Sequence, residues 1–389
     1  MPPLRPLLVI GTRPEAIKLA PIVLACRRQP GEIEPIVCLT GQHREMLDQV
    51  VEYFGIEADV DLGLMRPNQS LTDLTARCLS GLDEVLNRFK PDCVVAQGDT
   101  TTTAAAALAA FYRRVPLVHV EAGLRTGNMQ APWPEELNRR MATLAAALHC
   151  APTEHARQNL LREHVPADSV VVTGNTVVDA LVETARRERG RDAFWREKHD
   201  YLADRRMVLI TCHRRENVGE PMAQICRAIL MLAAEFPDVE FVFPIHLNPQ
   251  VHGPIYRILR RHADENLHLL DPVGYAEFVW LMDRSSLILS DSGGVQEEAP
   301  SLGKRVLVMR DTTERPEAVA AGFAELVGAD VRRIVERAGV ILCGAGRSAA
   351  PPIGANPYGD GRAAERIIEE LMRRFVASAD ISVRLRLAA

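Results

Sequence analysis

Residues 7–18 read Leu-Leu-Val-Ile-Gly-Thr-Arg-Pro-Glu-Ala-Ile-Lys, a short apolar run that passes through one glycine into a helix-like segment. Short apolar runs are typical of strands in a parallel sheet, which are buried on both faces. Pro14 suits the first turn of a helix, where its missing N–H has no hydrogen bond to lose. The stretch therefore predicts a strand, a glycine turn and a helix, which is the start of a βαβ unit.

The same alternation of strand-like and helix-like segments recurs along the chain and predicts two parallel sheets. The first series of apolar runs continues with Pro35 to Leu39, Cys93 to Gln97, Leu117 to Val120 and Val170 to Thr173. A helical, charge-rich stretch from Val182 to Arg206 follows, and the alternation then restarts. The second series is Met207 to Thr211, Val239 to Ile245, Leu267 to Leu270, Leu287 to Ser290 and Val306 to Met309. Apolar residues about four apart between Arg362 and Val376 predict a last helix.

The length supports two domains, because 389 residues exceed what one ordinary core contains. We assign residues 1–173 to an N-terminal Rossmann-like domain and residues 174–361 to a C-terminal one. The segment 362–389, which includes the last helix, is expected to pack back on the N-terminal domain. The predicted fold class is therefore α/β, with two Rossmann-like domains built on parallel sheets.

The composition excludes several kinds of partner. A net charge of -5 argues against nucleic acid and anionic membranes, which attract clustered Lys and Arg. The eight cysteines are scattered without a Cys-x-x-Cys pair, as expected for free thiols in a reducing compartment. Arg13 interrupts the first apolar run too early for a signal peptide, and no later run approaches ~20 apolar residues. We therefore expect a cytoplasmic protein with no membrane or nucleic-acid partner.

Charged residues stand at predicted strand ends, where ligands bind in open α/β sheets. The first glycine turn leads to Arg13 and Lys18, which form either an anion site or an ordinary turn with solvated charges. Asp99 follows the third predicted strand, and it is either a helix N-cap or a functional acid. Glu121 follows the next strand, so that two carboxylates at one sheet edge favour catalysis.

Two further segments carry titratable side chains. Glu135 and Glu136 fall in the first turn of a predicted helix, where acids usually serve the helix dipole, so alone they carry little functional weight. His213 follows a strand of the second half, where it can hold phosphate or donate a proton to a leaving oxygen. No second His or Cys stands at ligand spacing nearby, so we expect no metal.

The segment Asp-Ser-Gly-Gly-Val-Gln-Glu-Glu at 291–298 follows another predicted strand. Two glycines at a helix start let backbone N–H groups approach phosphate oxygens closely, and Glu298, one turn in, can accept both hydroxyls of a ribose. Arg315, after the next strand, adds a cation to the same edge. These residues predict a nucleotide half-site, and the alternative is a tight turn with a charged rim.

In these motifs the chain resembles the bacterial UDP-N-acetylglucosamine 2-epimerases of the non-hydrolysing type. Ten collinear blocks carry the resemblance: Gly-Thr-Arg-Pro-Glu-Ala-Ile-Lys (11–18), Thr-Gly-Gln-His (40–43), Gln-Gly-Asp-Thr-Thr-Thr (97–102), His-Val-Glu-Ala-Gly-Leu-Arg-Thr-Gly (119–127), Pro-Trp-Pro-Glu-Glu (132–136), Gly-Asn-Thr-Val-Val-Asp (174–179), His-Arg-Arg-Glu-Asn (213–217), Ser-Asp-Ser-Gly-Gly-Val-Gln-Glu-Glu-Ala-Pro (290–300), Asp-Thr-Thr-Glu-Arg-Pro-Glu (311–317) and Asn-Pro-Tyr-Gly-Asp-Gly (356–361). They cover nearly the whole chain.

The resemblance implies the GT-B architecture, in which two domains face each other across a cleft that holds a UDP-amino-sugar, and it implies a homodimer. It implies acid and base roles for Asp99, Glu121 and Glu135, and His213 is a fourth catalytic candidate that would also contact UDP. The expected substrate-binding residues are Arg13, Lys18, Gln97, Arg139, Phe278, Ser292, Gly293, Gly294, Glu298 and Arg315.

Some members of the family are activated by their own substrate at an adjacent site. The residues that would form this site here are Gln42, His43, Glu136 and His246. The chain departs from the family pattern at Glu45, where Gln is usual, and at Asn68, where Arg is usual. Loss of that cation weakens the prediction of a regulatory site.

Inversion at C2 of the sugar needs no redox cofactor in this scheme. The C2 proton is not acidic, so cleavage of the anomeric C–O bond must first give oxocarbenium character at C1. UDP then leaves to give a 2-acetamidoglucal, a proton returns from the other face and UDP re-adds. A ketone route would need NAD. The stretch 344–352 fits the dinucleotide fingerprint only loosely, and Pro351 and Pro352 interrupt the helix it would need.

Four alternatives use the same motifs. A hydrolysing epimerase would release UDP and N-acetylmannosamine, and a related epimerase would act on a modified UDP-amino-sugar. A GT-B glycosyltransferase would share the nucleotide half-site but has no use for three carboxylates around C2. A silent UDP-sugar sensor is the non-enzymatic alternative, and the intact acids argue against it.

Overall fold

A computed structural model describes residues 2–41, 45–66, 69–202, 204–246, 249–260, 265–344 and 356–376. It divides the chain into two compact units. Unit 1 contains residues 1–180 and 358–389, and unit 2 contains residues 181–357. The chain passes from unit 1 to unit 2 after Ala180 and returns after Pro357, whereas the sequence analysis placed the boundaries after residues 173 and 361.

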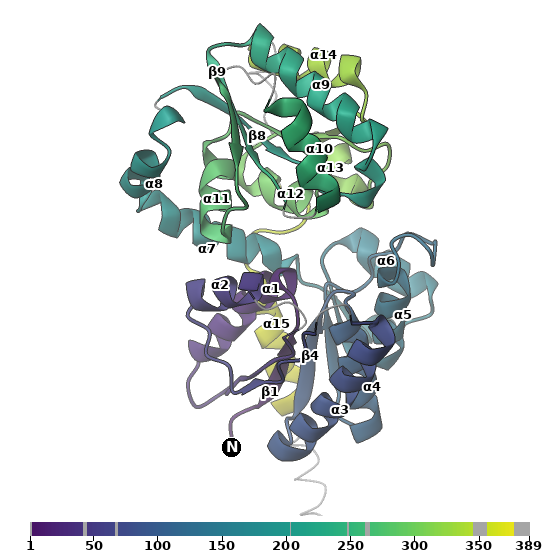
Figure 1. The fold of residues 1–389 in the computed structure, drawn as a ribbon. Helices are drawn as coiled ribbons and strands as arrows, with labels where there is room; N and C mark the ends of the chain where they lie inside the picture. The colour runs from purple at the N-terminus through teal and green to yellow at the C-terminus, as the bar shows by residue number, and fades with distance from the viewer. Residues whose placement is uncertain are drawn as a thin grey trace, which may run out of the picture. The chain divides into compact units, whose positions relative to one another are not determined.

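Unit 1 is a seven-stranded, wholly parallel sheet with helices on its faces (Figure 1). Its strands are β1 (Pro6–Ile10), β2 (Ile36–Leu39), β3 (Val60–Asp61), β4 (Cys93–Gln97), β5 (Leu117–Val120), β6 (Ala146–Ala151) and β7 (Val170–Val172). Their order across the sheet is β3-β2-β1-β4-β5-β6-β7. Its helices are α1 (Arg13–Arg27), α2 (Glu45–Tyr53), α3 (Leu71–Phe89), α4 (Thr101–Arg113), α5 (Glu135–Ala145), α6 (Glu154–Arg162) and α15 (Ala363–Leu371), while α7 (Thr176–Arg189) continues into unit 2.

Unit 2 repeats the plan with six parallel strands in the order β10-β9-β8-β11-β12-β13. The strands are β8 (Arg206–Thr211), β9 (Val239–Pro244), β10 (Leu267–Leu270), β11 (Leu287–Ser290), β12 (Val306–Val308) and β13 (Ala324–Leu326). The helices are α8 (Asp192–Lys198), α9 (Glu220–Glu235), α10 (Pro249–Leu259), α11 (Tyr275–Arg284), α12 (Gly293–Glu298), α13 (Pro316–Ala320) and α14 (Val331–Leu342). The predicted pair of Rossmann-like α/β domains is confirmed.

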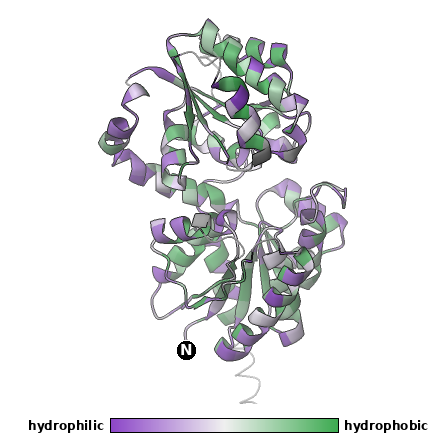
Figure 2. Ribbon diagram, viewed as in Figure 1, coloured by the Kyte–Doolittle hydropathy of each residue, from purple (hydrophilic) through white to green (hydrophobic). Residues whose placement is uncertain are grey.

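The central strands are buried on both faces because helices cover both sides of each sheet. Every residue of β1 and β4 is buried, and the strands stand out as apolar in Figure 2. All ten predicted strands form, but β3, β6 and β13 were not predicted. β3 and β13 are only two and three residues long, and β6 continues the apolar run of α5 without a break, so periodicity cannot separate them.

The predicted last helix is α15, which packs against α1 within unit 1 and is followed by a π-helical turn at Met372–Val376. The Asp179 carboxylate accepts the first backbone N–H groups of α15, from Ala363 at 3.1 Å and Ala364 at 2.8 Å. A carboxylate at a helix N-terminus satisfies donors that lack intrahelical partners. Across the described ranges, no helix has the length and apolar character needed to cross a membrane.

Candidate active site

Each sheet reverses its strand order beside its first strand, and Arg13, Asp99, His213 and Ser292 follow the strands on either side of these points. Unit 1 contains Arg13, Lys18, Gln97, Asp99, Glu121, Glu135, Glu136 and Arg139. Unit 2 contains His213, His246, Phe278, Ser292, Gly293, Gly294, Glu298 and Arg315. Gln42, His43 and Asn68 lie outside the described residues, and the side chain of Glu45 is not described either.

Glu121 is the centre of a charged cluster after β5. The Lys18 Nζ lies 2.6 Å from one of its carboxylate oxygens and 2.7 Å from the other, and Gln97 Nε2 donates to the same group. Glu121 also adopts a φ of 62°, a left-handed conformation that is costly for a residue with a side chain. The fold thus holds this carboxylate in one orientation, with a cation and an amide against it.

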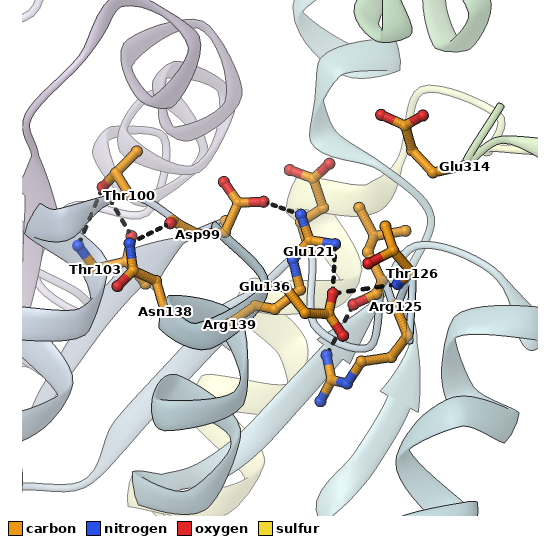
Figure 3. Close-up of polar contacts among 12 residues, drawn as sticks. Asp99, Thr100, Thr103, Glu121, Arg125, Thr126, Glu136, Asn138, Arg139 and Glu314 are labelled. Carbon is orange, nitrogen blue, oxygen red and sulfur yellow. Dashed lines mark hydrogen bonds and ion pairs between the residues drawn. The ribbon is translucent and has the colours of Figure 1, made fainter. Parts of the chain in front are cut away.

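Asp99 forms an ion pair with Arg139 of α5, whose side chain is almost fully buried (Figure 3). The alternative that Asp99 is a helix N-cap is wrong, because Thr100 caps α4 by accepting the Thr103 N–H at 3.1 Å. The Asp99 carboxylate is therefore not used by the helix start. The structure brings Asp99 together with Arg139, a residue that was expected to bind substrate.

Glu135 and Glu136 begin α5 as predicted, but their surroundings differ. The fully buried Glu136 carboxylate accepts hydrogen bonds from the Thr126 N–H at 3.1 Å and from Arg139 at 3.3 Å (Figure 3). It also accepts one from Arg140 at 3.1 Å. By contrast, the buried Oε2 of Glu135 has no hydrogen-bond partner among the described residues. Glu136 therefore supports the loop and helix around it, whereas Glu135 retains an oxygen that can act on a ligand.

Two buried titratable residues of unit 1 were not singled out from the sequence. Glu15 accepts the Gly11 N–H at 2.9 Å and the Thr100 hydroxyl at 2.6 Å, and its burial raises its pKa despite these bonds. His119 bonds the Gly98 carbonyl oxygen through Nε2 at 2.8 Å, and burial lowers its pKa to about 3, so the ring is neutral at pH 7. The sequence gives little indication that Glu15 is buried and bonded to Thr100, since an acid in the first turn of a helix usually interacts with the helix dipole.

In unit 2, the buried Asp291 organises the turn after β8. Its carboxylate accepts the backbone N–H groups of His213 at 3.0 Å and Arg214 at 2.9 Å, and the side-chain amide of Asn217 at 2.9 Å. The Cys212 thiol donates to it at 3.1 Å. A carboxylate that accepts several hydrogen bonds fixes the backbone of the residues that donate to it. It thereby fixes the position of His213.

His213 is less basic than the sequence suggests. Burial, Arg214 and His246 lower its pKa below the ordinary value, and the nearby Asp291 only partly opposes this. The ring of His246, which is exposed, stacks on that of His213 with centroids 5.5 Å apart. The lowered pKa makes the neutral imidazole the main form of His213 at pH 7.

The start of α12 is shaped by Gly293 and Arg315. A Cβ atom at Gly293 would lie 2.5 Å from Arg315 Cζ, so only glycine lets the guanidinium pack here. Arg315 is held by Glu297 at 2.9 Å and by Glu314 at 2.7 Å. Ser292 is the residue before this helix, Gly294 follows Gly293, and both are half-buried. The predicted glycine turn and its cation therefore meet.

Other cations gather beside this turn. Burial alone would raise the pKa of Glu314, but Arg315, Arg310 and Arg214 together hold it at about 2. Glu298 accepts a hydrogen bond from the Tyr275 hydroxyl at 3.0 Å, and the half-buried Phe278 lies on the same helix as Tyr275. The carboxylate expected to bind a ribose is thus oriented by a tyrosine that was not predicted from the sequence. No group of three or more metal-ligating side chains occurs in the part of the chain that the structure describes.

Each of the two α/β units is built on a parallel sheet. One unit carries carboxylates at its strand ends, and the other has a glycine-rich helix start beside arginines. These features define an enzyme of the GT-B class. The family model for UDP-N-acetylglucosamine 2-epimerase matches residues 7–372. The UDP-N-acetylglucosamine 2-epimerase of Salmonella typhimurium is 52% identical over 369 residues, which are 94% of this chain and 97% of that protein. The chain belongs to the UDP-N-acetylglucosamine 2-epimerase family, and the resemblance found in its motifs is confirmed.

Solved structures agree with this assignment. The crystal structure of the Neisseria meningitidis UDP-GlcNAc 2-epimerase bound to UDP-GlcNAc is 49% identical, with a TM-score of 0.90 over 95% of this chain and all of that one. The Methanocaldococcus jannaschii UDP-GlcNAc 2-epimerase, in complex with UDP-GlcNAc and UDP, is 32% identical with a TM-score of 0.80, again over 95% of this chain and 100% of the other. Likeness therefore extends over both units.

Proposed function

We propose that this enzyme interconverts UDP-N-acetylglucosamine and UDP-N-acetylmannosamine by eliminating UDP and adding it back. A carboxylate takes the C2 proton while the C1–O bond breaks with its electrons on UDP. The resulting 2-acetamidoglucal then receives a proton at C2 from the opposite face, and UDP re-forms the bond to C1. Atoms and charges balance without a redox cofactor.

The arrangement of acids in unit 1 is the observation that supports this reaction best. Asp99, Glu121 and Glu135 follow β4, follow β5 and begin α5, so that three carboxylates come from adjacent elements. Proton transfer on both faces of a sugar needs separate groups, and these carboxylates differ in their partners. Glu121 is paired with Lys18, Asp99 with Arg139, and one oxygen of Glu135 has no hydrogen-bond partner within the described ranges.

Unit 2 supplies the nucleotide side of the proposal. Developing negative charge on UDP would be stabilised by backbone N–H groups at Ser292 to Gly294, by Arg315 and by His213. Glu298, held by Tyr275, would accept ribose hydroxyls. The other residues proposed to bind substrate are Arg13, Lys18, Gln97 and Arg139 of unit 1 and Phe278 of unit 2.

Incubation with UDP-N-acetylglucosamine in heavy water tests the reaction. Proton abstraction and return predict UDP-N-acetylmannosamine that carries one deuterium at C2, detected by NMR and mass spectrometry. Product without deuterium at C2 would rule out the proposed chemistry. Free N-acetylmannosamine in place of the UDP-sugar would identify a hydrolysing enzyme, and UDP release that depends on an added acceptor would identify a glycosyltransferase.

We also propose a cytoplasmic homodimer formed through unit 1. An apolar stripe, composed of Leu137, Met141 and Leu144 on α5 with Phe111 and Tyr112 on α4, is exposed, and Leu144 is 87% exposed. These side chains lie on two helices that pack against each other, and exposed apolar surface of this kind favours association. Light scattering should give twice the 43.0 kDa chain mass for the native protein and the chain mass for Leu144→Glu. A native monomer would contradict the proposal.

A further inference from the structure

The turn that carries Asp99 is held by its backbone as well as by its side chain. Three successive carbonyl oxygens each accept a hydrogen bond from a buried side chain of a different element. Gln97 O accepts from the Thr103 hydroxyl at 2.7 Å, and Gly98 O bonds His119 Nε2 at 2.8 Å. Asp99 O accepts from Asn138 Nδ2 at 2.9 Å (Figure 3). The turn is therefore fixed from α4, β5 and α5 at once.

Asn138 differs from the other two because its helix also carries Glu135. The two residues are three positions apart on α5, so they lie on the same side of the helix. The next residue, Arg139, pairs with the carboxylate of Asp99. One helix therefore binds Asp99 through both its carbonyl and its carboxylate, and begins with a second proposed acid.

The stability of α5 alone does not explain why residue 138 is an asparagine. Asparagine is a poor residue for a helix interior, because its side chain competes with the backbone for hydrogen bonds. At 7% exposure, its amide is also removed from water. Its position is explained by the bond to Asp99 O, which lies 39 residues away in sequence.

We propose that Asn138 is a positioning residue that keeps Asp99 at a fixed place relative to Glu135. This inference rests on the proposed function, in which both acids exchange protons with one sugar ring. Displacement of one acid by about 1 Å can cost about 100-fold in rate, since proton transfer needs hydrogen-bond distance. Asn138 itself touches no reacting atom in this scheme, so its loss should affect turnover more than substrate binding.

The experiment compares Asn138→Leu with Asn266→Leu in the full-length enzyme. Asn266 is a buried asparagine of unit 2 whose amide donates to the carbonyls of Ala233, Phe236 and Val239, and it has no part in the proposed chemistry. Both changes remove hydrogen bonds to backbone carbonyls in buried surroundings, so both should lower Tm by roughly 2–8 °C. Well below the Tm of each variant, kcat should fall about 10- to 100-fold for Asn138→Leu with KM within about threefold, and stay near the native value for Asn266→Leu.

Asn138→Asp adds a second measurement, the pH dependence of kcat, which would not change if Asn138 only stabilised the fold. When protonated, the new carboxylic acid can donate to Asp99 O from nearly the same place as the lost amide, whereas the ionised form cannot. Burial beside an acceptor raises the pKa of such a group. The ratio of kcat for Asn138→Asp to kcat for Asn138→Leu should therefore rise several-fold as pH falls from 8 to 6, and other titrations cancel in this ratio.

The outcomes separate the two proposals. A fall in kcat confined to the Asn138 variants, with a ratio that rises toward low pH, supports the positioning role. If the native enzyme epimerises but Asn138→Leu keeps a kcat within twofold of Asn266→Leu, or the ratio is flat, the inference is overturned and the proposed function stands. A native protein that forms no epimer refutes the proposed function, and the role of Asn138 with it.

Discussion

Glu15 in unit 1 and Asp291 in unit 2 each connect the two turns that lie where the strand order of their sheet reverses. In unit 1 the carboxylate comes from the first of these turns, and in unit 2 it comes from the second. Glu15 lies after the first strand, β1, and accepts from Thr100 in the turn after β4. Asp291 lies after β11, the strand that takes the place of β4 in the second sheet, and accepts from His213 and Arg214 after β8. Each unit therefore uses one buried carboxylate to fix the edge where its strand order reverses.

The difference shows that one topology supports two chemistries. In unit 1 the turns after β4 and β5 carry acids paired with cations, while in unit 2 the turn after β11 is glycine-rich and lies beside arginines. The strand order β3-β2-β1-β4-β5-β6 is repeated by β10-β9-β8-β11-β12-β13. Function is therefore decided by the turns rather than by the sheets.

The largest expected effect tests the assignment of acid chemistry to unit 1. Glu121→Gln keeps the shape of the side chain but removes a charge and a proton acceptor, so kcat should fall about 10²- to 10⁴-fold. The affinity for UDP should stay within about threefold, because the nucleotide is assigned to unit 2. Steady-state kinetics and calorimetry with UDP measure both quantities. Glu154→Gln, which breaks a carboxylate–arginine pair on the surface, serves as the control with native kcat. Native kcat in Glu121→Gln would contradict the assignment.

The next prediction concerns the buried carboxylate of unit 2. Asp291→Asn places an amide N–H against groups that are themselves donors, so we expect a loss of about 3 kcal/mol in stability. Denaturant unfolding followed by tryptophan fluorescence suits this test, since Trp195 and Trp280 both lie in unit 2. Asp238→Asn removes an exposed ion pair with Arg206 and should change stability little. Equal midpoints for the two variants would show that Asp291 does not fix its turn.

Gly293→Ala probes the nucleotide side with a smaller change. The added Cβ would lie 2.5 Å from Arg315 Cζ, so the guanidinium must move away from Glu297. We expect the Kd for UDP to rise about 10- to 100-fold, equivalent to about 1.4–2.7 kcal/mol, with kcat at saturation changed less than threefold. Gly339→Ala, whose Cβ would make only an ordinary contact with Phe236, is the control in calorimetric titrations. Unchanged affinity for Gly293→Ala would remove Arg315 from the proposed site.

The smallest predicted effect is a pH dependence that distinguishes Glu15. Its pKa is raised in the folded protein, so the folded state binds the proton more tightly than the unfolded state does. Its contribution to stability is therefore complete below the unfolded value of about 4.5 and is lost as pH rises through the folded pKa. Gln does not titrate, so the Tm of Glu15→Gln minus that of the native protein should increase from pH 5 to 8. A Tm difference for Glu15→Gln that does not change between pH 5 and 8 would contradict this prediction.

Much of the architecture could be predicted because it depends on short stretches of neighbouring residues. Runs such as Cys93 to Gln97 have the length and apolar character of buried strands, and Pro14 marks the first turn of a helix in both sequence and structure. Asp99 and Glu121 could be found as site candidates because they follow such runs. The unpredicted β6 has no such mark, since its apolar residues continue those of α5.

The partners of the site residues could not be predicted from local sequence. Lys18 meets Glu121 across 103 positions, and Asp291 meets His213 across 78. By residue type, Asp99 and Thr100 are equally suitable N-caps, and only the geometry of the turn selects Thr100. These contacts depend on strand order and on the angle at which each helix leaves its strand.

The amino-acid sequence by itself determined the alternation of strands and helices, the two-domain α/β class, the family and the positions of the candidate acids. These follow from periodicity, turn chemistry and collinear motifs, which are properties of neighbouring residues. Only the tertiary structure decided which acid is paired, which is buried and which keeps an unbonded oxygen. Those properties arise from desolvation and from contacts between distant segments, so they exist only once the sheets have assembled.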